Sequence, residues 1–235
     1  LKRFAMSDCR PVGTAAESAK KFLKIREGEE SCDVSKYQCA IGSLNYAAIA
    51  TRPDISQAVG MLSQFMQSPS EEHWIGIKRI LRYLKGTLSF GLKFSRSDSF
   101  VLHGYSDSDW AGCSESRKST SGLIFRLGEC TVSWRSKKQS IVALSSTEAE
   151  YVALCEACQE VTWLRRLLHD IGLPQTSVPT TVYEDNQGAM ALSMNPKDHP
   201  RTKHIDVKFH YIRDCIDRKR VNLEYVRTTD MVADT

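Results

Sequence analysis

The sequence lacks any apolar run that approaches the roughly 18 residues required by a membrane-spanning helix. It also lacks the basic, apolar and small-residue segments of a signal peptide at its start. Its eight cysteines are scattered, without the ordered spacing of a secreted disulfide framework. These absences predict reduced thiols in an intracellular, cytoplasmic protein with no membrane segment.

Neither sign of charge dominates the chain, whose formal net charge is +4. With 41% hydrophobic and 26% charged residues, the composition is that of an ordinary globular protein. A chain of 235 residues can bury a sizeable core in one large domain or two modest ones. The mild basicity is compatible with a polyanionic partner but does not require one. The chain begins at Leu1 rather than methionine, so we expect a piece of a longer protein.

Motifs for several kinds of chemistry are absent as well. There is no glycine-rich phosphate loop. Cys155 and Cys158 lie inside a predicted helix without evident partners, which favours small buried residues over a redox or zinc site. His204 and His210 are not spaced at i and i+4, so the sequence does not favour a zinc site there either.

The first part of the chain has a helical pattern. Residues 1–30 are polar and interrupted by proline and glycine, as in a linker, and residues 34–86 carry helical periodicity. The clearest helix covers residues 71–85, with one apolar stripe formed by Trp74, Ile77, Leu81 and Leu84. Lys78, Arg82 and Lys85 form a neighbouring stripe, either a solvated basic face or a surface that contacts phosphates.

A different pattern begins near residue 89. Short runs rich in β-forming residues cover 88–94, 100–106, 122–127 and 130–135. A long helix over 146–171 follows, then a strand at 180–184, helices at 186–194 and 203–219, a strand at 221–226 and a helix from Asp230 onward. This order predicts an α/β layered domain with a mixed sheet, and a domain boundary near residue 95.

Carboxylates lie at the ends of these predicted elements. Asp107 and Asp185 follow strands, Glu150 is near the start of the long helix, and Asp234 is at the start of the last helix. Several carboxylates from different elements can hold two hard cations for a phosphodiester displacement. Acids at such positions also suit turns and helix dipoles, so position alone leaves both interpretations open. Glu148 completes a capping-box pattern with Ser145 and is expected to be a cap partner.

Ordered motifs run through the whole second part of the chain: Tyr105–Gly112, Lys118–Phe125, Val132–Gln139, Ala143–Tyr151, Glu184–Ala189 and Arg201–Val207. Together they resemble the ribonuclease H region of copia-type (Pseudoviridae) retrotransposon Pol polyproteins. Upstream, three further motifs resemble the segment that joins polymerase to ribonuclease H in these polyproteins: Gly42–Tyr46, Thr51–Ile55 and His73–Gly86.

The resemblance implies a ribonuclease H-like fold, in which helices flank a mixed five-stranded sheet, preceded by a small mainly helical region. Residues 1–95 would be the C-terminal helical, connection part of a reverse transcriptase, and residues 96–235 a ribonuclease H domain with a truncated last helix. The expected partners are an RNA–DNA hybrid and the polymerase domain of the same polyprotein. The resemblance leaves virus-like particles open as a location. Because no Tyr-Val-Asp-Asp motif is present, this segment is not expected to polymerise DNA.

Carried over by position, the family's catalytic metal ligands fall on Asp107, Glu150, Asp185 and Asp234, with Asp109 a less favoured alternative to Asp107. They would hold two Mg²⁺ ions, or Mn²⁺ as a substitute. The implied reaction is hydrolysis of the RNA strand of an RNA–DNA hybrid, leaving a 5′-phosphate and a 3′-hydroxyl. Candidate substrate contacts are Ser145, Ser146, Asn186, Gln187, Lys137, Lys138, Lys203 and His204.

Two alternatives remain at this stage. The first is a catalytically inactive relic that keeps the fold and binds nucleic acid. The second is a related two-metal nuclease of the integrase type that acts on DNA ends.

Overall fold

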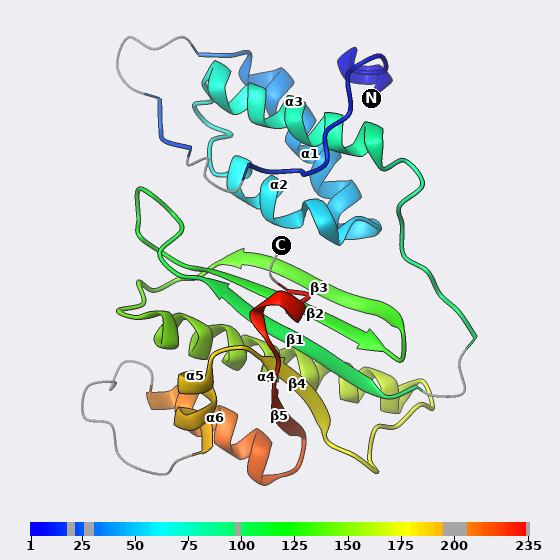
Figure 1. The fold of residues 1–235 in the computed structure, drawn as a ribbon, viewed down its shortest axis with the longest axis vertical. Helices are drawn as coiled ribbons and strands as arrows, with labels where there is room; N and C mark the ends of the chain where they lie inside the picture. The colour runs from blue at the N-terminus through cyan, green and yellow to red at the C-terminus, as the bar shows by residue number, and fades with distance from the viewer. Residues whose placement is uncertain (18–21, 26–30, 97–99, 195–205, 234–235) are drawn as a thin grey trace. The chain divides into compact units, whose positions relative to one another are not determined.

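The computed structural model describes residues 1–17, 22–25, 31–96, 100–194 and 206–233. The chain forms two compact units (Figure 1). Unit 1 comprises residues 1–92 with 113–115, and unit 2 comprises residues 93–112 with 116–235. Each unit buries an apolar core of its own, and the two cores share no residue.

Unit 1 is helical. Its helices are α1 (Val34–Ala50), α2 (Ser56–Ser63) and α3 (Glu71–Gly86), with short 3-10 turns at Lys2–Phe4 and Pro53–Ile55. Asp33 caps α1 because its side chain accepts a hydrogen bond from the Lys36 backbone N–H. Ile77 and Leu81 of the predicted α3 stripe are buried, and Trp74 and Leu84 pack against the same core.

The start of the chain is more than the predicted linker. Leu1, Phe4 and Met6 pack against the core of unit 1. Polar composition and turn residues suggested a linker, but the few apolar side chains in this stretch bury against the helices instead of remaining in solvent. The linker prediction is therefore wrong for these residues.

Unit 2 contains a mixed five-stranded sheet. Its strands are β1 (Leu102–Asp109), β2 (Thr120–Leu127), β3 (Cys130–Lys138), β4 (Thr180–Glu184) and β5 (Val221–Tyr225), in the order β3-β2-β1-β4-β5. The pairs β1–β2 and β2–β3 are antiparallel, whereas β1–β4 and β4–β5 are parallel. The predicted α/β fold with a mixed sheet is confirmed.

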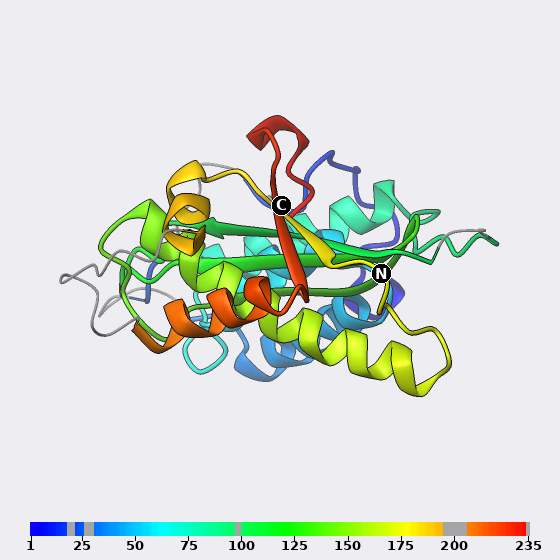
Figure 2. The ribbon, with the colours of Figure 1, turned by 90° about the horizontal axis from the view of Figure 1, so that it is seen from below.

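Helices and the C-terminal segment cover this sheet. The 25-residue helix α4 (Ser146–Asp170) packs on the sheet through side chains such as Leu154 and Val161, accompanied by α5 (Gln187–Met194) and α6 (Asp206–Asp217). Figure 2 shows α4 and α6 on one face of the sheet and the segment with the 3-10 turn Thr228–Asp230 on the other. Cys155 and Cys158 are free thiols buried in this core, as expected.

Two predicted elements are not formed. Residues 88–94 contain no strand, because Leu88, Phe90 and Phe94 stay 61–69% exposed and an alternating pattern makes a strand only where a neighbour strand and a core are available. The helix predicted from Asp230 onward is also not formed over 231–233, where Met231 adopts an extended backbone. Within the described ranges, no helix combines the length and the apolar character needed to cross a bilayer.

A candidate metal centre at one end of the sheet

Asp107 lies towards the carboxyl end of β1, a central strand that pairs with β2 and β4. Its partner in the β1–β2 register is Gly122. A Cβ added to Gly122 would lie 2.7 Å from the Ala233 carbonyl oxygen, so the glycine permits the C-terminal segment to approach the sheet beside Asp107. Asp234, the next residue, lies outside the described residues.

Asp185 directly follows β4, the parallel neighbour of β1. Because the carboxyl ends of parallel strands meet at one edge of a sheet, Asp185 comes to the same edge as Asp107. Its Oδ2 accepts a hydrogen bond of 2.7 Å from Thr228 Oγ1. The turn at Thr228–Asp230 thus fixes the orientation of the Asp185 carboxylate.

Glu150 comes from the start of α4. The Ser145 side chain caps this helix by accepting the Glu148 N–H at 3.1 Å, while Glu148 Oε2 accepts the Leu144 N–H at 2.8 Å. Glu148 thus has a structural role at the helix start, as expected, although its side chain accepts from Leu144, the residue before the Ser145 cap. Buried Gln139 ties this helix to the sheet, since its Nε2 donates to Ser121 Oγ (3.0 Å) and to the Ala149 carbonyl (2.9 Å). The Ser145 cap and the two Gln139 hydrogen bonds together fix the position of the first turns of α4, which carry Glu150.

The structure brings Asp107, Glu150 and Asp185 together, with one carboxylate oxygen of each lying within 4.8 Å of the others. Glu150 is 6% exposed, and its Oε2 has no hydrogen-bond partner among the described residues. Burial and the negative charge of Asp107 raise the pKa of Glu150 to about 8. Three converging carboxylates with an unsatisfied buried oxygen form an oxygen-rich donor set that suits a hard divalent cation such as Mg²⁺.

Sequence reasoning missed Glu184, the residue before Asp185. Its side chain is completely buried, and the Asn186 backbone N–H donates to its Oε1 at 3.3 Å. Burial and the charge of Glu150 raise its pKa well above the usual range. The signal was the alternation along β4, where Thr180, Val182 and Glu184 are the buried positions.

The predicted substrate contacts have varied surroundings. Ser145 serves as the α4 cap, whereas Ser146 is exposed. Asn186 Oδ1 accepts the Ala189 N–H at 3.0 Å at the start of α5, and Gln187 is exposed beside it. Lys137 and Lys138 end β3, opposite Ser121 and Thr120 of β2. Lys203 and His204 lie outside the described residues.

Asp109 does not belong to the cluster of three acids. Its carboxylate lies against Gly112, where an added Cβ would overlap Asp109 Oδ2. The geometry therefore favours Asp107 over Asp109 as the acid contributed by β1.

No family model matches the chain. The chain is 44% identical, over its whole length, to the retrovirus-related Pol polyprotein from transposon TNT 1-94 of Nicotiana tabacum, and 42% identical to that from transposon RE2 of Arabidopsis thaliana. It spans only 18% and 16% of these two relatives. A third relative, the secreted RxLR effector protein 161 of Plasmopara viticola, is 56% identical over 54% of this chain and 90% of its own length.

Among solved structures, the foamy viral protease-reverse transcriptase dRH in complex with double-stranded DNA matches 87% of this chain and 33% of its own. The TM-score is 0.51 at 15% identity. With a mixed five-stranded sheet in the order β3-β2-β1-β4-β5 flanked by helices, unit 2 has the ribonuclease H-like fold. Three acidic side chains meet at one end of this sheet. The chain belongs to the family of copia-type retrotransposon Pol polyproteins.

Proposed function

We propose that unit 2 is a metal-dependent endoribonuclease that hydrolyses the RNA strand of RNA–DNA hybrids during reverse transcription of a retrotransposon. The observation that carries this proposal is the meeting of Asp107, Glu150 and Asp185 from three different elements within 4.8 Å. The ribonuclease H-like fold and the Pol relatives support it.

In this proposal Asp107, Glu150 and Asp185 hold two Mg²⁺ ions, for which Mn²⁺ can substitute, and Asp234 is proposed as a fourth ligand. The bound ions would supply Lewis-acid activation of water and charge neutralisation at the scissile phosphate. The protein holds its ligands on rigid elements: a central strand, the end of β4 and the first turns of α4. Thr228 orients Asp185, and Gln139 anchors the helix that carries Glu150.

Substrate binding is proposed at the same end of the sheet. Ser146 and Gln187 are exposed at the starts of α4 and α5, close in sequence to Glu150 and Asp185, and are candidates for contacts with the RNA 2′-hydroxyl. Lys137 and Lys138 are candidates for phosphate contacts. We further propose that residues 1–95 are the connection part of a reverse transcriptase whose polymerase domain is the partner, acting in the cytoplasm or in virus-like particles.

Asp185→Asn tests the proposal. The amide preserves the shape of the side chain, and its oxygen can still accept the Thr228 hydroxyl, so folding should be unchanged. The rate of cleavage of a labelled RNA–DNA hybrid in Mg²⁺ should fall by about 100-fold or more. Replacing a residue that only hydrogen-bonds to a metal ligand already lowers metal affinity or activity about 10- to 100-fold, and Asp185 is proposed as a ligand itself. Asp217→Asn, an exposed acid at the end of α6, is the matched control and should cleave normally.

The same assay separates the alternatives. Cleavage of the RNA strand alone, abolished by chelator, supports the proposal. Retained activity in Asp185→Asn, cleavage of DNA duplex but not hybrid, or binding of hybrid without any cleavage would each overturn it.

A further inference from the structure

A second polar site lies at the other end of unit 2. A pocket of about 470 Å³ is formed by the last turns of α4, the connection to β4 and the residue before β5. Its charged lining consists of Arg165, Arg166 and Arg220 against a single carboxylate, Asp170. We call this the arginine pocket. Positive charge therefore dominates it, although the chain as a whole is only mildly basic.

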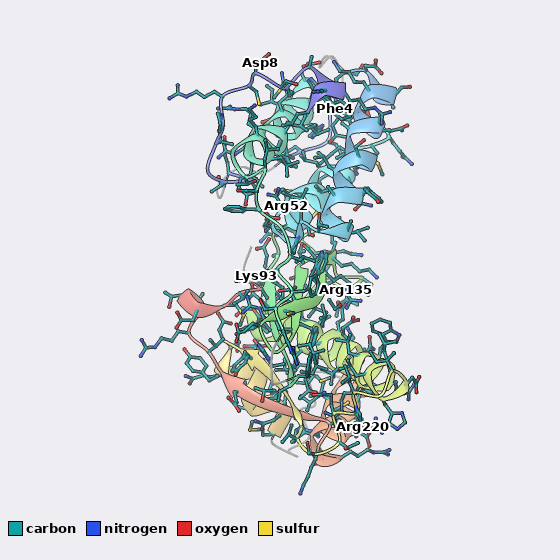
Figure 3. All side chains as sticks on the ribbon, turned by 90° about the vertical axis from the view of Figure 1, so that its right-hand side faces the viewer. Phe4, Asp8, Arg52, Lys93, Arg135 and Arg220 are labelled. Carbon is teal, nitrogen blue, oxygen red and sulfur yellow. The ribbon has the colours of Figure 1, made fainter. Side chains whose placement is uncertain are left out.

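The arginines of this pocket are not neutralised by neighbouring acids. In the described part of the chain, Arg166 and Arg220 form no ion pair, whereas Arg135 pairs with Glu156 at 3.1 Å and Arg218 with Asp214 at 2.6 Å (Figure 3 labels Arg135 and Arg220). Asp170 is largely exposed and contacts His169 at 3.4 Å. Unpaired guanidinium groups that line one hollow provide the fork of donors that suits phosphate oxygens.

Arg165 is held in place within the pocket. Its Nη1 donates to the Val178 carbonyl and to Thr180 Oγ1, both at 3.1 Å. Burial and, to a smaller extent, the positive charge of Arg220 lower the pKa of Arg165, as expected for two guanidinium groups that repel each other where water is partly excluded. A bound anion would relieve this repulsion, and the fixed Arg165 side chain would lose little entropy on binding it.

An aromatic side chain flanks the arginine pocket. Trp163 is 55% exposed and lies three residues before Arg166, so the two side chains are neighbours on the α4 surface. Exposed aromatic rings beside basic grooves are typical of sites that bind single-stranded nucleic acid, where bases stack on the ring and cations contact the backbone. Free phosphate would not need this ring.

The arginine pocket is separate from the acidic cluster. Arg220 and Thr180 lie at the amino ends of β5 and β4, whereas Asp185 follows the carboxyl end of β4. Along α4, Glu150 and Arg165 are 15 residues apart, which corresponds to about 22 Å. A ligand in the pocket therefore does not touch the acids proposed to hold metal.

We propose that the arginine pocket binds the phosphates of a single-stranded nucleic acid segment, with Trp163 as a stacking platform for a base. This inference goes beyond the proposed function and does not depend on cleavage. Strand binding and catalysis can therefore fail independently of each other.

The test measures binding of a fluorescein-labelled single-stranded 12-mer to the full chain by anisotropy, with chelator present to prevent cleavage. Arg220→Gln and Arg166→Gln should weaken binding several-fold, and each should reduce the slope of log K against log salt by about 0.7 for one lost phosphate contact. Trp163→Leu should weaken binding about tenfold through the loss of stacking. Arg218→Gln, which removes the same charge outside the pocket, is the matched control and should change binding less than twofold.

Binding of inorganic pyrophosphate is measured for the same variants, because the same arginines could also bind a free phosphate compound. Nucleic acid as the ligand requires that the 12-mer bind far more tightly than pyrophosphate and that Trp163→Leu affect the 12-mer alone. If Arg220→Gln loses pyrophosphate but retains the 12-mer, the ligand is a small phosphate and the proposal is wrong. Equal losses in Arg220→Gln and Arg218→Gln would reduce the effect to bulk charge and would also overturn it. Thermal melting of each variant checks that the fold is kept.

Discussion

At the scale of single residues, the acidic cluster contains an electrostatic conflict. Asp107, Glu150 and Asp185 bring carboxylate oxygens within 4.8 Å of one another. Glu184, the residue before Asp185, adds a fourth acidic side chain that is fully buried. Negative charges this close oppose one another, so a proton or a cation must offset part of the repulsion. The raised pKa values of Glu150 and Glu184 express this conflict in the metal-free protein.

This conflict makes the stability of the metal-free chain depend on pH. Since the pKa of Glu150 is about 8 in the fold against 4.5 for the free group, the folded state binds the extra proton between these values. The contribution of Glu150 to the free energy of unfolding should therefore be greatest below about pH 4.5. It should decline by on the order of a few kcal/mol as the pH rises towards 8. Urea unfolding in chelator at pH 5.5 and 8.5 measures this decline.

Two comparisons check its cause. Glu150→Gln removes the ionisable group and should reduce the decline of stability with pH, leaving the part that comes from buried Glu184. Added Mg²⁺ should stabilise the wild-type chain more at pH 8.5 than at 5.5, because ligands must lose their protons to bind metal. An unchanged slope in Glu150→Gln would show that other groups cause the decline.

The sequence could indicate part of this site at the residue scale. Asp107, Glu150 and Asp185 each belong to a recognisable motif at an element end, and the structure brings these three together. Thr228 and Gln139 could not be found in this way, because they act through hydrogen bonds to residues distant in sequence. Thr228 donates one to Asp185, and Gln139 donates two, to Ser121 and to Ala149. Local patterns contain no information on such tertiary contacts. The structure also leaves Asp234, Lys203 and His204 as predictions.

At the scale of elements, two segments that the sequence predicts as strands have different outcomes. Residues 180–184 form β4 as predicted, with Val182 completely buried, whereas residues 88–94 form no strand and leave Phe90 exposed. The difference lies outside both segments. β4 pairs with β1 on one side and β5 on the other, and α4 packs against it. Among the described residues, no strand pairs with residues 88–94. Strand propensity therefore decides little without a place in the sheet.

Packing between β1 and β2 explains a glycine inside a central strand. A Cβ at Gly104 would lie 2.3 Å from the Phe125 ring, so β1 can carry only glycine there without displacing a core aromatic. We predict that Gly104→Ala destabilises unit 2 by about 1–3 kcal/mol through overpacking. Gly42→Ala in α1, where nothing lies within 4 Å, should instead stabilise unit 1 by about 0.5–1 kcal/mol. Urea unfolding of both variants measures the two changes in the free energy of unfolding. Changes of equal size and sign would refute the packing argument.

At the scale of the whole molecule, two separate cores share one chain. The core of unit 1 is built from α1, α2 and α3, and that of unit 2 from the sheet and α4 to α6. Since cores of this kind can fold independently, each unit is expected to have its own stability.

We therefore predict two thermal transitions in calorimetry of the full chain. Ile80→Ala removes a fully buried side chain from the first core and Leu154→Ala one from the second, each at a cost of about 2–5 kcal/mol. Each substitution should lower one transition and leave the other within experimental error. Hydrogen exchange read by mass spectrometry assigns the transitions, because the destabilised unit alone should lose protection. A single transition lowered equally by both substitutions would mean that the two cores unfold as one cooperative block, and that the folded state of unit 2 depends thermodynamically on unit 1.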